Sequence, residues 1–283
     1  MSRQVLLIGE NGQLGYELNH MLLPLACVTS LDMPEFDLTD PVLVRSTVRE
    51  LRPNLIINAA AFTDVEKAEE EPELANAING TAPGILAEEA NSVGAGLVHY
   101  STDYVFDGSK ASAYVEDDKP HPLSAYGRSK LGGENAVRAV GVPHLILRTS
   151  WLYGTRGKNF FLTTLRLARS RDELKMLVEL DWDLPTMGET YHVTAQGSTS
   201  WFGFAKAIIS QALIPRANHV RLVPISTNEY PTKAHRPLNS VLSNEKLLRD
   251  FGISLPNWQE DLKTVISLLD AESIALMTQG IRR

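Results

Sequence analysis

A short apolar run followed at once by spaced glycines constrains the fold of this chain more than any other feature. The run Val5-Leu6-Leu7-Ile8 leads into Gly9, Gly12 and Gly15, and apolar residues then recur at helical spacing over 13–23. A strand, a glycine turn and a helix in this order place a pyrophosphate on backbone N–H groups at the helix N-terminus. Glycine is needed where a side chain would block the tight turn or the phosphate. The segment therefore predicts a dinucleotide site at the start of the chain.

The first half of the chain alternates strand-like apolar runs with helical periodicity. This alternation is typical of a parallel sheet covered by helices on both faces. We therefore predict an α/β fold, a Rossmann-type doubly wound parallel sheet. The predicted strands are 4–8, 26–31, 55–58, 97–101 and 145–149, and the predicted helices are 13–23, 41–51, 72–93 and 124–140.

After Ser150 the alternation becomes less regular and aromatic residues cluster. We predict a dinucleotide-binding domain over 1–150 and a smaller C-terminal substrate-binding region over 151–283, with part of 172–213 packing back on the first domain. The helices expected there are 159–170, 199–214, 244–251 and 258–270, and the polar, proline-rich stretch 225–236 is expected to be a loop.

The second predicted strand ends at Asp32, about 20 residues after the first glycine. An acid at this place accepts hydrogen bonds from the adenosine ribose hydroxyls and repels a 2′-phosphate. Glu10, inside the glycine turn, adds a second negative charge. The pair predicts that NADH binds better than NADPH.

A hydroxyl, a phenol and an ammonium suited to carbonyl chemistry follow later in the chain. Tyr126 and Lys130 are four residues apart, so on a helix they would share one face. A nearby lysine cation is expected to lower the pKa of the phenol, which would make Tyr126 a proton donor to an alkoxide at neutral pH. Thr102 would orient the carbonyl oxygen from the other side.

Several of these candidates follow predicted strands directly. The glycine turn, Asp32, Asn58-Ala59-Ala60-Ala61 and Ser101-Thr102-Asp103 all come at such places. Ligands of open parallel sheets bind beyond the carboxyl ends of the strands. The sequence therefore predicts one site at one edge of the sheet.

Composition argues against several other classes of protein. A net charge of −7 disfavours nucleic acid or an anionic membrane as partner. No apolar run approaches the roughly 18 residues of a membrane span, and no leader pattern opens the chain, so we expect a cytoplasmic protein. Cys27 is the single cysteine, the histidines lack metal-type spacing, and the glutamates of 66–73 fit a solvated helix start. No metal is expected.

With these residues in hand, the chain resembles the extended short-chain dehydrogenases/reductases, and within them the dTDP-4-dehydrorhamnose reductase family. The resemblance runs over nearly the whole length, in the family's order. Its motifs are Gly9–Gly15, Asn58–Ala61, His99–Phe106, the Tyr126/Lys130 pair, Arg148–Trp151, Asn159-Phe160, Tyr191-His192 and Arg236-Pro237-Leu238-Asn239-Ser240.

The resemblance implies reduction of the C4 ketone of dTDP-4-dehydro-L-rhamnose by NADH or NADPH, in rhamnose and cell-surface polysaccharide biosynthesis. Carried over by position, Thr102, Tyr126 and Lys130 would be catalytic, and Thr102, Asp103, Tyr126 and Trp151 would bind the dTDP-sugar. The implied cofactor-binding residues are Gly9, Gly12, Gln13, Leu14, Gly15, Asp32, Asp37, Leu38, Ala61, Phe62, Thr63, Tyr100, Tyr126 and Lys130.

Two alternatives stay open at this point. A related sugar-nucleotide epimerase or dehydratase shares the glycine turn and the Tyr/Lys pair, but recycles its cofactor, whereas a reductase consumes it. A non-catalytic regulatory subunit of the methionine adenosyltransferase type keeps the fold. The complete set of Thr102, Tyr126 and Lys130 argues against that second alternative.

The chain departs from the family at Asp181-Trp182-Asp183-Leu184-Pro185-Thr186. In the family an Asp-Gln-x-Gly-x-Pro-Thr stretch precedes a long helix, and here Tyr191-His192 follows almost at once. A parallel crossover needs about a dozen residues or more. We therefore predict that 174–180 or 191–194 is displaced or lost, or that they pair antiparallel through a turn at 185–188. The missing helix would uncover apolar surface that a second subunit of a homodimer could cover.

Overall fold

The computed structural model describes residues 3–153, 188–211, 222–225, 229 and 232–267. The chain divides into two compact units. Unit 1 comprises Met1–Ser150, Leu177–Thr194 and Thr232–Ser254, and unit 2 comprises Trp151–Met176, Ala195–Pro231 and Leu255–Arg283. Residues of the stretch 151–283 therefore occur in both units.

Unit 1 is built on a six-stranded parallel sheet with the order β2-β1-β3-β4-β5-β6. The five strands predicted in the first half are confirmed, with ends that shift by at most one residue. The strands are β1 (Gln4–Ile8), β2 (Cys27–Leu31), β3 (Leu55–Asn58), β4 (Gly96–Thr102), β5 (His144–Thr149) and β6 (Glu189–His192).

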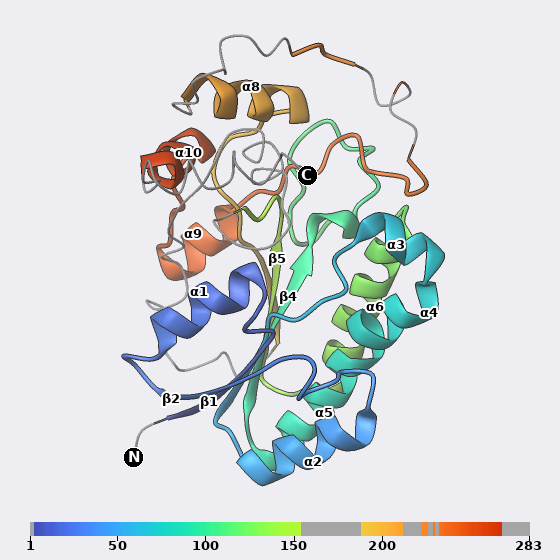
Figure 1. Cartoon of the computed structure of the whole chain (residues 1–283), viewed down its shortest axis with the longest axis vertical. Coiled ribbons are helices and arrows are strands. Elements are labelled where there is room, and N and C mark those ends of the chain that lie inside the picture. Colours follow the sequence, from blue (N-terminus) through green and yellow to red (C-terminus); the bar gives the residue numbers. More distant parts are fainter. Residues whose placement is uncertain (1–2, 154–187, 212–221, 226–228, 230–231, 268–283) are drawn as a thin grey trace, which may run out of the picture. The chain divides into compact units, whose positions relative to one another are not determined.

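The chain reverses direction across the sheet at β1, which lies between β2 and β3. From β1 the chain goes to β2 on one side, and from β3 it continues to β4 and β5 on the other. Helix α1 (Gln13–Leu22) lies on one face of the sheet, whereas α2 (Pro41–Leu51), α5 (Ala82–Val93) and α6 (Ala125–Val140) cover the other (Figure 1). Such a reversal opens a crevice for ligands at the carboxyl ends of the neighbouring strands.

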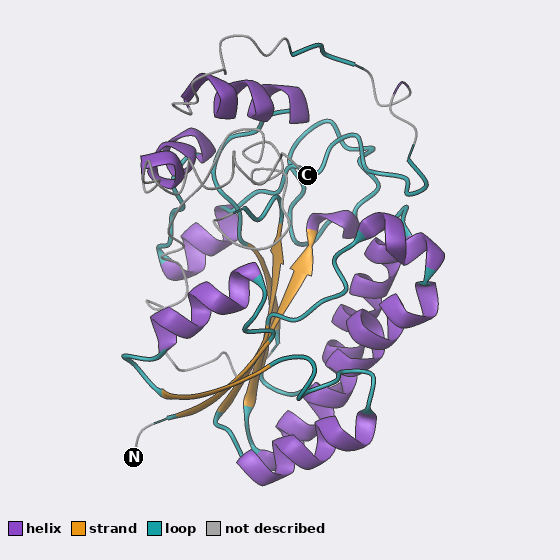
Figure 2. Cartoon of the chain, viewed as in Figure 1, coloured by secondary structure: helices purple, strands orange, loops and turns teal. Residues whose placement is uncertain are grey.

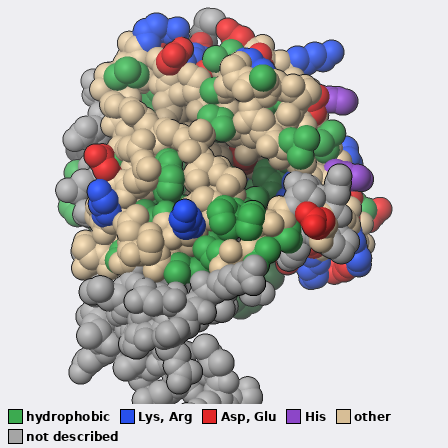
Figure 3. Space-filling view, turned by 90° about the horizontal axis from the view of Figure 1, so that it is seen from above, with side chains coloured by type: hydrophobic (Ala, Val, Ile, Leu, Met, Phe, Trp, Pro, Cys, Tyr) green, Lys and Arg blue, Asp and Glu red, His purple; other side chains and the backbone are tan. Residues whose placement is uncertain are grey.

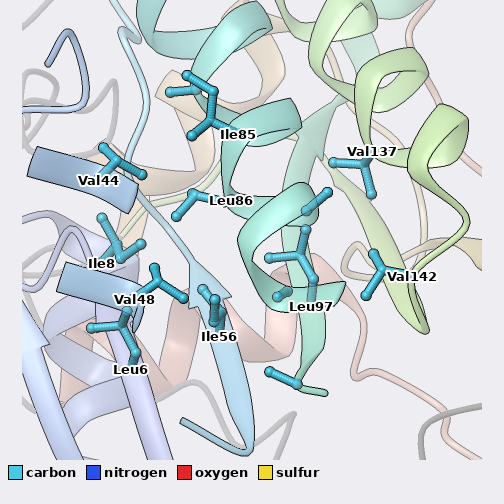
Figure 4. Close-up of a cluster of buried hydrophobic side chains, with 14 of the residues drawn as sticks. Leu6, Ile8, Val44, Val48, Ile56, Ile85, Leu86, Leu97, Val137 and Val142 are labelled. Atoms are coloured by element: carbon cyan, nitrogen blue, oxygen red, sulfur yellow. The ribbon is translucent and has the colours of Figure 1, made fainter. Parts of the chain in front are cut away.

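The main core lies between this sheet and the helices α2, α5 and α6. Figure 4 shows its side chains converging from both layers, and most of them are inaccessible to solvent. Helix α2 begins where expected, because the Asp40 carboxylate accepts hydrogen bonds from the N–H groups of Val42 and Leu43 and Pro41 follows at once. The labelled core residues are Leu6, Ile8, Val44, Val48, Ile56, Ile85, Leu86, Leu97, Val137 and Val142.

The predicted helix 72–93 is helical throughout but not uniform. It consists of α4 (Pro72–Asn76), a π-helical turn η1 (Ala77–Thr81) and α5. A further short helix, α3 (Val65–Glu70), precedes it and contains part of the glutamate cluster that was predicted to start a helix. Single π-turns occur often at functional sites, and η1 packs against α6.

Later parts of the chain return to unit 1. Strand β6 pairs in parallel with β5, from Leu145↔Glu189 to Arg148↔His192. Helix α9 (Glu245–Phe251) packs against β6, and the 3₁₀ turn η2 (Asp103–Val105) follows β4. Of the segments in the predicted rearrangement, 174–180 and 185–187 lie outside the described residues, as does the predicted helix 159–170, so those predictions remain predictions.

In unit 2 the structure describes two helices, α8 (Trp201–Gln211) and α10 (Trp258–Ser267). Both are drawn in purple in Figure 2. They agree with the predicted 199–214 and 258–270 as far as the description extends. Phe204 and Ile208 of α8 pack with Leu262 and Val265 of α10. Amphipathic spacing on both helices therefore produces a separate small core.

Charged side chains of both signs are interspersed on the face seen in Figure 3. Among the residues that the structure describes, none of the helices combines the length and apolar character needed to cross a bilayer. Within the same residues, no three His, Cys, Asp or Glu side chains are placed to hold a metal ion together.

Candidate active site

The glycine turn between β1 and α1 is shaped by close backbone contacts. Gly9 has a φ of +93°, and a Cβ atom there would lie 2.6 Å from the backbone nitrogen of Ala60. A Cβ atom on Gly15 would lie 1.9 Å from the carbonyl oxygen of Gly9. Gly12 precedes α1 in an extended conformation and offers no side-chain cap to the first N–H groups of the helix. This backbone cradle fits a pyrophosphate.

Asp32 lies beside this turn at the carboxyl end of β2. Its Oδ2 accepts a hydrogen bond of 2.8 Å from the N–H of Asn11, and its Oδ1 accepts one of 2.8 Å from the N–H of Met33. The structure thus joins the predicted ribose-binding acid to the predicted phosphate turn. The side chain is partly exposed, so its remaining lone pairs are accessible to ribose hydroxyls.

Two further cofactor candidates follow β2. The Asp37 Oδ1 accepts hydrogen bonds of 2.8 Å from both the N–H and the Oγ1 of Thr39. Leu38 is buried in the main core, where it packs with residues such as Phe36. Leu38 therefore has a packing role in addition to the one that the resemblance implies.

The loop after β3 contains the candidates Ala61, Phe62 and Thr63, and a residue that sequence analysis missed holds it. Asn79 is fully buried in the π-turn η1. Its Oδ1 accepts from the N–H of Phe62 at 2.9 Å, and its Nδ2 donates to the Phe62 carbonyl oxygen at 3.0 Å and to the Ser129 Oγ at 3.0 Å. An asparagine within a helical run gives little signal by itself in the sequence.

Thr102 ends β4 and begins the turn η2. Its Oγ1 accepts from the N–H of Tyr104 at 3.2 Å and donates to the Asp103 Oδ1 at 3.1 Å. Burial raises the pKa of Asp103 to about 6, against the opposing effect of hydrogen bonds from Ser240 and Thr102. Ser240 lies in the Arg236–Ser240 motif, so the fold brings this late motif to the end of β4.

Helix α6 presents the phenol and the ammonium of the predicted catalytic set. The Ser124 Oγ caps it by accepting from the N–H of Gly127 at 3.1 Å. Tyr126 is in the first turn and shares a hydrogen bond with the Thr102 hydroxyl. Lys130, one turn later, is 2% exposed, and its Nζ donates to the carbonyl oxygen of Tyr100 at 2.6 Å.

The predicted direction of the Tyr126 pKa is wrong. Burial raises the pKa of this phenol above its ordinary value, and the hydrogen bond with Thr102 opposes that rise only in part. Desolvation disfavours the phenolate, and the Lys130 ammonium is directed to the Tyr100 carbonyl group. The phenol is therefore protonated at neutral pH.

Thr102, Tyr126 and Lys130 are thus brought together in unit 1, whereas Trp151 is the first residue of unit 2. Trp151 has a φ of +52°, a conformation that is costly for a bulky side chain. Its ring lies 3.8 Å from that of Trp201, measured between centroids, and edge-on to Phe204. The Trp151 indole therefore packs with the rings of Trp201 and Phe204 within unit 2.

Nearly the whole chain is similar to known proteins. The family model described as the RmlD substrate binding domain matches residues 3–187 and 176–271. The two matches overlap at 176–187, where the sequence departs from the predicted family pattern. Among curated proteins, dTDP-4-dehydrorhamnose reductase of Burkholderia thailandensis is 42% identical, over 90% of this chain and 95% of that protein. The reductase of the same name from Escherichia coli is 40% identical, over 94% and 97%.

A solved structure supports the same assignment. The crystal structure of dTDP-4-dehydrorhamnose reductase from Bacillus anthracis in complex with NADP superposes with a TM-score of 0.82 and is 36% identical. The match covers 93% of this chain and 98% of that one. Together the family model, the curated relatives and the fold show that this chain belongs to the dTDP-4-dehydrorhamnose reductase family.

Proposed function

We propose that this chain reduces the C4 ketone of dTDP-4-dehydro-L-rhamnose to dTDP-L-rhamnose. The observation that supports this most strongly is the shared hydrogen bond of Thr102 and Tyr126 beside the buried Lys130, at the end of β4. Membership of the reductase family supplies the substrate class. The product would enter rhamnose and cell-surface polysaccharide synthesis. We expect the enzyme to be cytoplasmic.

NADH or NADPH would supply the hydride when bound. The residues that would hold it are the glycine turn, Asp32 and the loop of Phe62, because they line the carboxyl ends of β1, β2 and β3. A Cβ atom at Gly9 or Gly15 would collide with backbone atoms, so the turn presents backbone without side chains at these two positions. The negative charges of Asp32 and Glu10 favour NADH over NADPH through repulsion of a 2′-phosphate.

Tyr126 would donate a proton to the substrate O4 as negative charge develops there. Its raised pKa keeps the phenol protonated across the neutral range. A donor whose pKa is too high is a weak acid, so the Lys130 charge must assist it during the reaction. The edge-on contact with Tyr104, at 5.7 Å between ring centroids, limits movement of the ring.

Thr102 would orient the C4 carbonyl oxygen beside Tyr126, to which its hydroxyl is hydrogen-bonded. Its hydroxyl is already tied to Asp103, which is 3% exposed and would face the sugar. The resemblance implies a contact between Trp151 and the deoxysugar, and this contact stays a prediction. The substrate of this site is a dTDP-sugar, and nucleic acid and membrane are not expected as partners.

A turnover assay with dTDP-4-dehydrorhamnose and NADH or NADPH tests the proposal. Oxidation of one cofactor per product molecule is expected, with dTDP-L-rhamnose as the product. A sugar-nucleotide epimerase or dehydratase would convert its substrate without net consumption of cofactor. A regulatory subunit would show no turnover and would co-purify with a large partner enzyme, and either result would overturn the proposal.

A further inference from the structure

A buried charge cluster lies directly behind the proposed catalytic set. Glu134 of α6 is fully buried, and its two carboxylate oxygens accept four hydrogen bonds. Arg148 of β5 donates from Nε at 2.8 Å and from Nη2 at 2.7 Å, which makes a bidentate pair. The Ser101 Oγ donates at 2.6 Å, and the Arg138 Nη2 donates at 2.8 Å.

Two members of this cluster, Ser101 and Glu134, lie close along the chain to residues of the proposed site. Ser101 precedes Thr102, and Glu134 follows Lys130 by one helical turn on the same face of α6. Arg148 pairs in register with Ser101 across β4 and β5. A single carboxylate therefore fixes the end of β4, which presents Thr102, against the helix that presents Tyr126 and Lys130.

The cluster also sets the electrostatic surroundings of Lys130. Burial lowers the pKa of Lys130 to about 8, and the charge of Glu134 opposes that effect. Burial would raise the pKa of Glu134, but the hydrogen bonds and charge of Arg148 lower it to about 2, so the carboxylate stays ionised. Within the described residues the ammonium forms no ion pair, and it donates a hydrogen bond to the Tyr100 carbonyl oxygen.

The other titratable groups around Lys130 come from several elements. On β4, burial and the Lys130 charge hold the pKa of His99 well below its usual value, and burial raises that of Tyr100, so both stay neutral. On α6 Tyr126 lies one helical turn before Lys130, and on η2 Asp103 is the titratable group whose charge acts on Tyr126. The charged residue Glu89 of α5 instead pairs with Arg45 and Arg49 of α2. Glu134 is thus the acid whose charge supports the protonated state of Lys130.

We propose that Glu134 is a positioning residue that keeps Lys130 protonated and aligned for its role in cofactor binding and proton donation. This inference rests on the proposed function of Lys130. Its alternative is that Glu134 and Arg148 merely stabilise the fold. A purely structural ion pair would change stability but would leave the pH dependence of the site unchanged.

The test compares Glu134→Gln with Glu89→Gln in the full chain. Both substitutions remove a buried carboxylate that is bound by arginines, and only Glu134 lies beside Lys130. NADH affinity is measured by its fluorescence on binding, and kcat/KM by cofactor oxidation, both across pH 6–10. Thermal unfolding followed by circular dichroism reports the stability of each variant.

In the wild-type protein, NADH affinity should fall as pH rises through the pKa of Lys130. Loss of the Glu134 charge removes an effect that raises this pKa. The descending limb of the plot of NADH affinity against pH should therefore move to lower pH, by about one unit. Glu134→Asp, which keeps the charge, should retain the wild-type limb with lower kcat. Glu89→Gln should destabilise the protein and leave the limb in place.

If Glu134→Gln does not fold, the double variant Glu134→Gln/Arg148→Met removes both buried charges and avoids an unpaired guanidinium. A fall in NADH affinity at the wild-type pH in folded Glu134→Gln, or in the folded double variant, would overturn the inference. The NADH measurement needs no sugar substrate, so it separates this outcome from failure of the proposed reaction. Absence of turnover in the wild-type protein, together with a shifted limb in Glu134→Gln, would reject the substrate and keep the role of Glu134.

Discussion

The two halves of the proposed site in unit 1 differ in the groups they offer to ligands: one offers backbone and the other offers side chains. The β1–α1–β2 segment offers backbone, with glycines at Gly9 and Gly15 and a partly exposed Asp32. The β4–α6–β5 segment offers buried side chains, among them Lys130 and Glu134. The first half depends on shape, which a single methyl group can destroy. The second depends on charge, which needs a buried partner to remain in place.

The chemistry of the second half should show the largest effect. Tyr126→Phe removes the proposed proton donor and should lower kcat by ~10²–10⁴-fold, because general acid catalysis is worth that much. NADH affinity should stay nearly intact, since the ring is kept. Steady-state kinetics and NADH titration measure the two quantities.

Tyr191→Phe is the matched control for this variant. It removes a phenol that lies on β6 and donates to the Asp250 carboxylate, so turnover should not change. Near-wild-type turnover by Tyr126→Phe would show that Tyr126 is not the proton donor. The β4–α6–β5 half of the site would then lack an identified general acid.

Lys130→Met should damage turnover and cofactor affinity together, by about 10²-fold and about tenfold. The ammonium has a share in both roles, and the thioether fills a similar volume. The same two assays apply. A loss of turnover at unchanged NADH affinity would confine Lys130 to the chemical step and contradict its proposed contact with the cofactor.

Gly15→Ala tests the half of the site that depends on shape. The new methyl group would lie 1.9 Å from the Gly9 carbonyl oxygen, so the turn must move. We expect NADH to bind at least about tenfold more weakly, measured by titration, which corresponds to roughly 1.4 kcal/mol.

Gly132→Ala on α6 is the control for the glycine turn, because its methyl group would have its nearest neighbours at 3.7 Å. It should leave NADH affinity unchanged and can raise stability slightly, since alanine favours a helix. Equal NADH affinity in the two alanine variants would show that the cradle tolerates a side chain.

The smallest effect concerns the choice of cofactor. Asp32 and Glu10 should make NADH bind better than NADPH by on the order of 1 kcal/mol, or about fivefold in affinity. Asp32→Asn should reduce this preference without lowering kcat with NADH. Comparison of Michaelis constants for the two cofactors measures it, and a clear preference of the wild-type protein for NADPH would contradict the repulsion argument.

Local sequence patterns predicted much of unit 1. The strands β1 to β5, the helix α6 and the turn at Gly9 follow from short-range rules on apolar runs, caps and glycine. The family followed from motifs in order along the chain. The positions of Thr102, Tyr126 and Lys130 on β4 and α6 also follow, because the carboxyl ends of parallel strands share an edge.

What the sequence did not predict depends on packing between distant segments. The pKa of Tyr126 rises because of burial that only the tertiary structure reveals. Glu134 and Asn79 look like ordinary polar helix residues until β5 and the Phe62 loop are placed against them. The return of α9 to unit 1 likewise has no local signal.

The side chain of Asn79 has a consequence for the engineering of this enzyme. It binds both the N–H and the carbonyl oxygen of Phe62, and through Ser129 it reaches the Tyr126 carbonyl oxygen. The loop after β3 is therefore not a separable module. A loop transplanted from a relative, for example to alter cofactor choice, would have to be accompanied by that relative's residue at position 79 and its π-turn. Otherwise the graft would also disturb α6, the helix that carries the proposed proton donor.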